Sequence, residues 1–172
     1  MVYRLTGRIA EAEMVYERAF ELMEKLAPGE EWDRATTLLG RAQVHAIREE
    51  FADAERLLFE ALRLRIRADG WCGPDVALVF DNLSGVYRHM GKMLAAERAI
   101  RKAIRMYRAC DSTETVNCGM AIGSLARMVA GQSMSEAKAL ANEALEIHRR
   151  VCPLGHPETA KSERLVEGLA KR

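Results

Sequence analysis

The sequence is poor in several features, and each scarcity excludes a class of protein. No apolar run approaches the roughly 20 residues of a membrane-spanning helix, and residues 1–13 lack the apolar stretch of a secretory signal. The net charge of +1 supplies no overall field to attract nucleic acid or anionic membrane. The four cysteines form no Cys-x-x-Cys pair, which favours reduced thiols. We therefore expect a cytoplasmic protein that does not enter membranes.

Patterns typical of β-strands are almost absent. Apolar residues recur at spacings of three and four, and the four prolines fall between the periodic segments. Asp111-Ser112-Thr113 is expected to cap the sixth helix, and Ser133 or Ser135 the seventh. The pattern predicts an all-α protein of about eight helices, with the approximate ranges 9–26, 32–48, 52–67, 75–90, 94–109, 114–130, 135–151 and 158–170.

The chain repeats itself. Two sets of alanines recur at intervals of 42, 42 and 41 residues, the second set always seven residues after the first. Short turns such as 91–93 join a first helix, called helix A, to a second, called helix B, so the two should be antiparallel. The alanines mark where helices should cross closely, and the pattern predicts a solenoid of stacked helix pairs. The two sets are Ala12, Ala54, Ala96, Ala137 and Ala19, Ala61, Ala103, Ala144.

One stretch carries a known repeat signature: a small residue on helix A, an aromatic, a glycine and two alanines. These are Ser84, Tyr87, Gly91, Ala96 and Ala103, and they resemble the tetratricopeptide repeat. The 42-residue period and residues 154–160 are similar to the kinesin light chain group of these repeats. The resemblance implies a right-handed superhelical solenoid. The rival is a HEAT-like array, and the regular alanine columns and the tight glycine turn argue against it.

We expect a single array over residues 1–172. It divides into a partial repeat (1–30), three repeats (31–73, 74–112 and 113–156) and a terminal helix (157–172). Tyr3 and Gly7 match only the end of an earlier helix A, and no polar cap precedes them. We expect the array to be part of a longer one, or its first helix to be covered by something else.

Motifs for catalysis are missing. The sequence has no Gly-x-Gly-x-x-Gly, phosphate-binding loop, Gly-x-Ser-x-Gly or His-Glu-x-x-His. His148, Cys152 and His156 have a spacing that could suit a metal, but prolines break the helix between them. We therefore predict no enzyme activity, no cofactor and no metal site, which leaves binding.

The resemblance implies that side chains of the A helices line a concave face and bind a peptide. Asn82 is the sharpest candidate because an amide can donate to and accept from a peptide backbone at once; alternatively it is a solvated residue or forms a hydrogen bond between helices. The carboxylate clamp of some tetratricopeptide repeats needs Lys where Leu39 and Asp81 stand, so we do not expect that mode. The candidate groove residues are Thr36, Leu39, Gln43, Leu78, Asp81, Asn82, His89, Ser124 and Arg127.

A second candidate surface is a basic stripe on a helix B. Its four arginines are spaced three, four and three residues apart, which places them on one helix face: Arg98, Arg101, Arg105 and Arg108. The stripe is either a solvated face or a site for an acidic protein segment or a nucleic-acid backbone. Only Tyr107 is close enough for base stacking, which favours protein. Trp71 either packs under its loop or anchors a neighbour.

The sequence therefore predicts a non-catalytic scaffold or adaptor that binds a protein segment on its helix-A face. The alternative is a structural module of a larger assembly, which contacts its partners through its ends and through the basic stripe.

Overall fold

The computed structural model describes residues 9–26, 31–71 and 73–171. Over these residues the chain forms helices and no strand. All eight predicted helices are present, with ends within two residues of the predicted ones. Tyr3, Gly7 and Cys72 lie outside the described residues. The helices are α2 (Ile9–Leu26), α3 (Glu31–Ile47), α4 (Phe51–Asp69), α5 (Pro74–His89), α6 (Met93–Ala109), α7 (Val116–Val129), α8 (Met134–Val151) and α9 (Pro157–Ala170).

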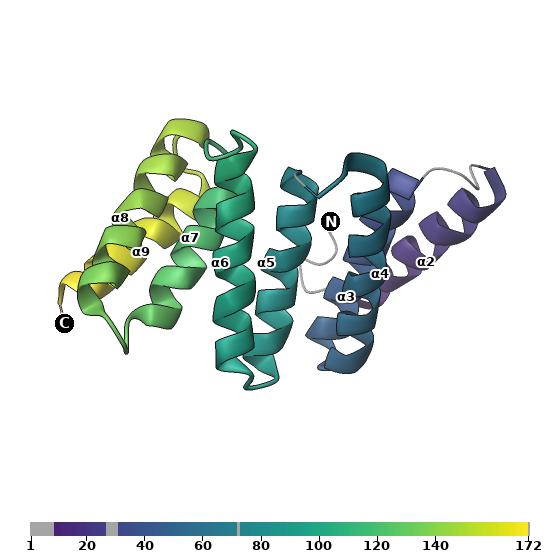
Figure 1. Ribbon diagram of the computed structural model, residues 1–172, viewed down its shortest axis with the longest axis horizontal. Helices are drawn as coiled ribbons and strands as arrows, with labels where there is room; N and C mark the ends of the chain where they lie inside the picture. The colour runs from purple at the N-terminus through teal and green to yellow at the C-terminus, as the bar shows by residue number, and fades with distance from the viewer. Residues whose placement is uncertain (1–8, 27–30, 72, 172) are drawn as a thin grey trace.

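The helices lie side by side in one row, from α2 at one end to α8 and α9 at the other (Figure 1). The A helices are α3, α5, α7 and the terminal α9, and the B helices are α2, α4, α6 and α8. The A helices α3, α5 and α7 each pack mainly on the B helix that follows, these pairs stack on one another, and the terminal α9 packs on α8. This is the α-helical solenoid that the repeat pattern predicts. No described helix combines the length and the apolar character needed to cross a bilayer.

The alanine columns form the core of the stack. Six of the eight predicted crossing alanines are fully buried at 0% exposure: Ala54, Ala61, Ala96, Ala103, Ala137 and Ala144. Small residues on the facing A helices, Ala42, Ser84 and Ala126, are also buried. Their burial confirms that helices approach closely at these positions. A larger side chain there would force neighbouring helices apart at a cost of about 1–3 kcal/mol.

The turns between helices A and B show why glycine recurs there. Gly91 has φ of 74°, a left-handed conformation that costs glycine nothing. Glu49 stands 42 residues earlier in the same column, and its φ is 64°. A residue with a Cβ strains the backbone by about 1–2 kcal/mol in this conformation. The turn of the repeat thus imposes a positive φ on Glu49, although glutamate prefers a negative φ.

Two helix N-termini are capped by side-chain hydroxyls. Ser133 accepts from the Glu136 amide at 3.3 Å, as predicted. The cap of α7 is Thr115, whose Oγ1 accepts from the Cys118 amide at 3.2 Å. The expected cap in residues 111–113 was therefore wrong, because α7 begins at Val116, two residues later than predicted.

A buried histidine fastens the last helix to the array. His148 of α8 is 1% exposed. Its Nε2 lies 3.2 Å from the Val116 carbonyl oxygen and its Nδ1 lies 2.8 Å from Ser162 Oγ of α9. A carbonyl only accepts, so Nε2 donates, and Nδ1 of the neutral ring accepts from the serine. Gly119 makes room for the ring, since a Cβ there would overlap it.

Candidate functional site

Two hollows mark the face formed by the A helices. The first lies between α3 and α5, has a volume of about 390 Å³ and holds Gln43, Asn82 and His89 in its lining. The second lies between α5 and α7, has a volume of about 410 Å³ and is lined in part by Ser124 and Arg127. Asp81 and Gly85 line both. We call the pair the A-face groove.

The two amides of the groove bind each other. Gln43 Nε2 donates to Asn82 Oδ1 at 2.9 Å, and Asn82 Nδ2 donates to the Leu78 carbonyl oxygen at 2.8 Å. Each amide nitrogen carries two hydrogens, so one N–H of each remains beyond these bonds. Asn82 therefore does link helices, the more modest of its two predicted roles, and it keeps donor capacity at the groove surface.

Asp81 and Arg127 give the centre of the groove its charge. Burial raises the pKa of Asp81 to about 6, although the positive charge of Arg127 lowers it in part. The pKa of Arg127 is itself lowered, first by partial burial of its guanidinium and second by the nearby charge of Arg88. The carboxylate is thus poorly solvated, and a cationic or hydrogen-bond-donating group from a ligand would stabilise its ionised form.

The end of the groove near the turn of the second repeat is aromatic. The His89 ring stacks on Phe51 with centroids 5.7 Å apart and an angle of 11° between the planes. Arg88 Nη2 lies 3.1 Å from His89 Nε2. Phe51 and Arg88 both line the groove, and the sequence reasoning missed both, because each lies outside the columns carried over by register.

Three of the predicted groove residues do not line the groove. Leu39 is only 6% exposed and belongs to the core, so its expected place on the binding surface was wrong. Leu78 packs against the same core cluster. Thr36 is exposed, but its hydroxyl accepts a hydrogen bond from Arg65 Nη2 at 2.7 Å. Arg65, which the sequence analysis did not single out, is 2% exposed, and its Nη1 also lies 3.7 Å from Asp75.

The basic stripe on α6 divides into two halves. Arg101 pairs with Glu97 and with Glu136 of α8, each at 2.8 Å, and Arg108 pairs with Glu143 of α8 at 2.8 Å. Hydrogen bonds to both glutamates raise the pKa of Arg101. Arg98 and Arg105 have no carboxylate within salt-bridge distance in the described part of the chain. Half of the stripe therefore joins two repeats, and the other half remains available to a partner.

The suspected metal-ligand residues have structural contacts. Both ring nitrogens of His148 are engaged as described above. His156 Nδ1 caps α9 by accepting from the Glu158 amide at 3.2 Å. Among the described residues, no three His, Cys, Asp or Glu side chains gather as a metal site would require.

The sequence matches the tetratricopeptide repeat family in two segments, residues 1–67 and residues 76–109. No curated protein gives a significant sequence match. The crystal structure of BtubC (BKLC) from P. vanneervenii is similar, with a TM-score of 0.78 and 14% identity, covering 98% of this chain and 68% of that one. A Podosopora anserina putative kinesin light chain structure with nearly identical TPR-like repeats has a TM-score of 0.69 and 17% identity, covering 98% and 81%. The chain is a tetratricopeptide repeat protein, and its fold resembles those of kinesin light chain-like repeat structures.

Proposed function

We propose that this protein is a non-catalytic scaffold that binds an extended segment of a partner protein in the A-face groove. Tetratricopeptide repeats serve protein–protein interaction, so the class of function follows from the family. The observation that carries the choice of face is that the two hollows share Asp81 and Gly85. They therefore adjoin at α5 and together extend across α3, α5 and α7, as a groove for an extended peptide would.

The groove chemistry suits a peptide backbone. The remaining amide N–H groups of Gln43 and Asn82 can donate to its carbonyls, and Asp81 can accept from its amides. Ile47 and Met128 add apolar surface to the lining. Such contacts give affinity with little sequence choice, so specificity would come from the charges of Asp81 and Arg127.

Gly85 offers a clean test because it lies in the groove floor and nothing lies within 4 Å of the position its Cβ would take. Gly85→Leu should fill the trough without disturbing the core. Gly168→Leu on α9 is a matched control, since it also lies in a helix and opens to free space. We would capture partners from an extract of the source cells with wild-type, Gly85→Leu and Gly168→Leu baits, after circular dichroism has established that all are folded.

We expect at least one partner to be lost from the Gly85→Leu bait and retained by the other two. A short segment of that partner should then bind the wild-type protein and should not bind the Gly85→Leu variant. Identical partner sets on all three baits would contradict the assignment of the A-face groove.

A second candidate function is a structural role in a larger assembly. It is favoured by exposed apolar side chains on α2, the helix at one end of the described array: Met14, Val15 and Leu22. Polar substitution of Met14 and Leu22 should then release the protein from a complex of high native mass, whereas Gly85→Leu should not. We place both roles in the cytoplasm, a proposal that the free thiols of Cys118 and Cys152 support.

A further inference from the structure

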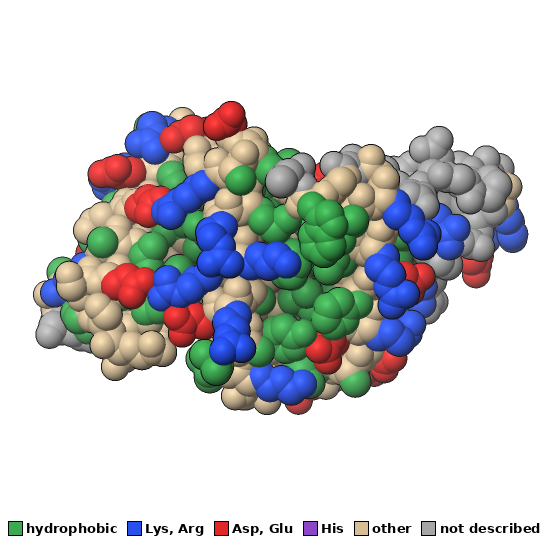
Figure 2. Space-filling view, viewed as in Figure 1, with side chains coloured by type: hydrophobic (Ala, Val, Ile, Leu, Met, Phe, Trp, Pro, Cys, Tyr) green, Lys and Arg blue, Asp and Glu red, His purple; other side chains and the backbone are tan. Residues whose placement is uncertain are grey.

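A second groove lies on the face formed by the B helices, between α4 and α6. Figure 2 shows a continuous apolar strip there with basic side chains on both sides. The strip contains two hollows of about 570 and 560 Å³, and Phe59 lines both. We call it the B-face groove. Its apolar lining comprises Phe59, Leu62, Ile66, Trp71, Phe80, Leu83, Tyr87, Met93, Leu94, Ala95 and Ala99.

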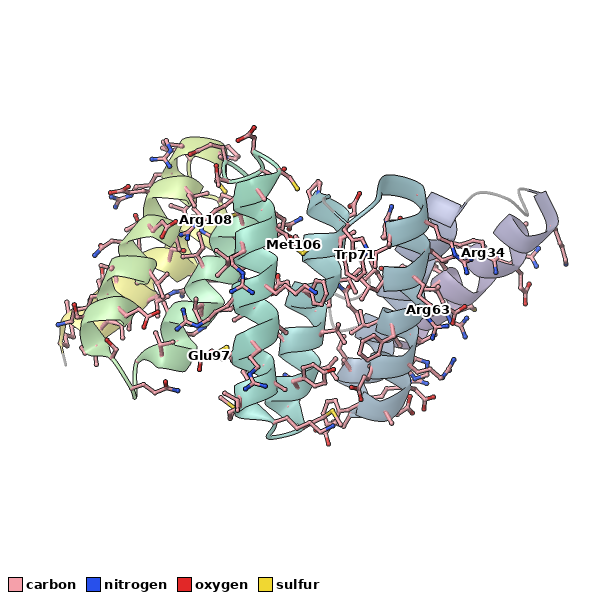
Figure 3. All side chains as sticks on the ribbon, viewed as in Figure 1. Arg34, Arg63, Trp71, Glu97, Met106 and Arg108 are labelled. Atoms are coloured by element: carbon pink, nitrogen blue, oxygen red, sulfur yellow. The ribbon has the colours of Figure 1, made fainter. Side chains whose placement is uncertain are left out.

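The apolar side chains of this groove are unusually exposed. Trp71 is 60% and Leu94 is 63% exposed, and Phe59 and Met93 are also exposed. Trp71 lies over the gap between α4 and α6 (Figure 3). A contiguous apolar patch framed by polar residues is typical of an interaction surface, whereas single exposed apolar residues are not informative. Trp71 thus does not pack under its loop.

The floor of the groove comes from α5, which lies between the two B helices. Phe80 and Tyr87 of α5 line the hollow next to α6. Lys102 of α6 reaches over this floor, with its Nζ 4.1 Å from the Phe80 ring centroid and 5.3 Å from that of Trp71. These cation–π contacts hold an ammonium group inside the apolar groove, where an incoming carboxylate would meet it.

The charged residues that line the groove are all basic. No Asp or Glu is among the described residues that line the two hollows. Two acids of α4 near the groove already have partners, since Glu55 accepts a hydrogen bond from the Tyr87 hydroxyl and Asp53 pairs with Arg56 at 3.5 Å. Arg63 and Arg98, on opposite rims, have no carboxylate within salt-bridge distance in the described ranges. The cations that line the groove are Arg56, Arg63 and Arg67 on α4 and Lys92, Arg98 and Lys102 along α6.

We propose that the B-face groove binds an acidic amphipathic helix of a partner protein. Apolar side chains at positions i, i+3 or i+4, and i+7 would cover the floor, and Asp or Glu on both flanks would face the two basic rims. The rim from Arg56 to Arg67 spans about 16 Å at 1.5 Å per residue, which corresponds to about three turns of a bound helix. Two like-charged rims around an apolar strip match this occupant better than a nucleic-acid backbone, which offers no apolar stripe.

The test is a selection from a displayed library of 16-residue peptides of high helix propensity, followed by fluorescence polarisation with the enriched peptides. One variant removes apolar surface (Trp71→Ala with Leu94→Ala), and a second reverses rim charge (Arg63→Glu with Arg98→Glu). All four side chains are exposed, so both variants should fold. The control variant makes the same kinds of change elsewhere, at the exposed residues Leu154 and Arg164 (Leu154→Ala with Arg164→Glu).

We expect the enriched peptides to be acidic with an apolar i, i+3 or i+4, i+7 pattern. Their affinity should fall at least about tenfold in each groove variant, less than about twofold in the control, and should weaken as salt is added. The proposal is overturned if no peptide is enriched or if the enriched peptides are neutral or basic. It is also overturned if binding responds only to Gly85→Leu, or if sedimentation shows that the groove joins two copies of this chain.

Discussion

Replacing Asp81 by asparagine should make the protein more stable near neutral pH and leave its stability unchanged in acid. The carboxyl lies at the junction of the two hollows of the A-face groove, where burial raises its pKa from 3.8 to about 6. The folded protein therefore resists ionisation of this group more than the unfolded chain does. Asparagine has nearly the same shape and no charge to bury.

The size of the effect follows from the shift. About two pKa units at roughly 1.4 kcal/mol each amount to about 3 kcal/mol, which is an upper value for this partly solvated site. Below about pH 3, well under the ordinary pKa of 3.8, the carboxyl is protonated in both states, and there is no penalty. As the pH rises from about 3 to about 6, the unfolded chain ionises first and the free energy of unfolding falls. Above about pH 6 the full cost is present.

Urea denaturation followed by circular dichroism at about pH 3 and about pH 7.5 measures this directly. The free energy of unfolding of Asp81→Asn should equal that of wild type at the lower pH and exceed it by about 1–3 kcal/mol at the higher pH. Glu167→Gln, at an exposed position of α9, is the control and should show no such pH-dependent difference. An Asp81→Asn protein that is no more stable than wild type at pH 7.5 would refute the reasoning.

Three further predictions concern the backbone and the core, and each is checked by urea denaturation. Glu49→Gly should raise the free energy of unfolding by about 1 kcal/mol, because position 49 has a left-handed conformation; no gain would contradict the assigned strain. Gly119→Ala should lower it by about 1–3 kcal/mol, since the new methyl group would overlap His148, whereas Gly85→Ala, which opens to free space, should raise it by about 0.5–1 kcal/mol. Ala103→Leu should lower it by about 1–3 kcal/mol because this crossing position is fully buried, and an unchanged value would mean that the helices can separate without cost.

The sequence was sufficient to predict the helices and their closest approaches. Helix ends and alanine columns are local or periodic features, so a single chain compared with itself reveals them. Even Glu49, which replaces the glycine of its column, has the left-handed backbone conformation of Gly91. The cap of α7 was misplaced because several residues before it have capping side chains and only the backbone decides among them.

The candidate sites were harder to predict from the sequence, because they depend on how side chains of different repeats face one another. Leu39 lies in the column that the resemblance assigns to the groove, but its side chain is in the core. Arg101 and Arg108 belong to the predicted stripe, but each also pairs with a glutamate on another repeat, 35 residues away. The B-face groove brings together Phe59, Phe80 and Leu94 from three helices, and no spacing within one helix indicates that they meet.

The ion pairs between α6 and α8 have a mechanical consequence. On the B-helix side, Arg101–Glu136 and Arg108–Glu143 tie these two helices together, and among the described residues no ion pair ties α4 to α6. Opening the array on this side would therefore break ion pairs between α6 and α8, each worth about 0–1 kcal/mol at such exposed positions, and none of the described ones between α4 and α6. A partner helix bound in the B-face groove would contact α4 and α6 at once and would supply the link between these two helices that ion pairs do not.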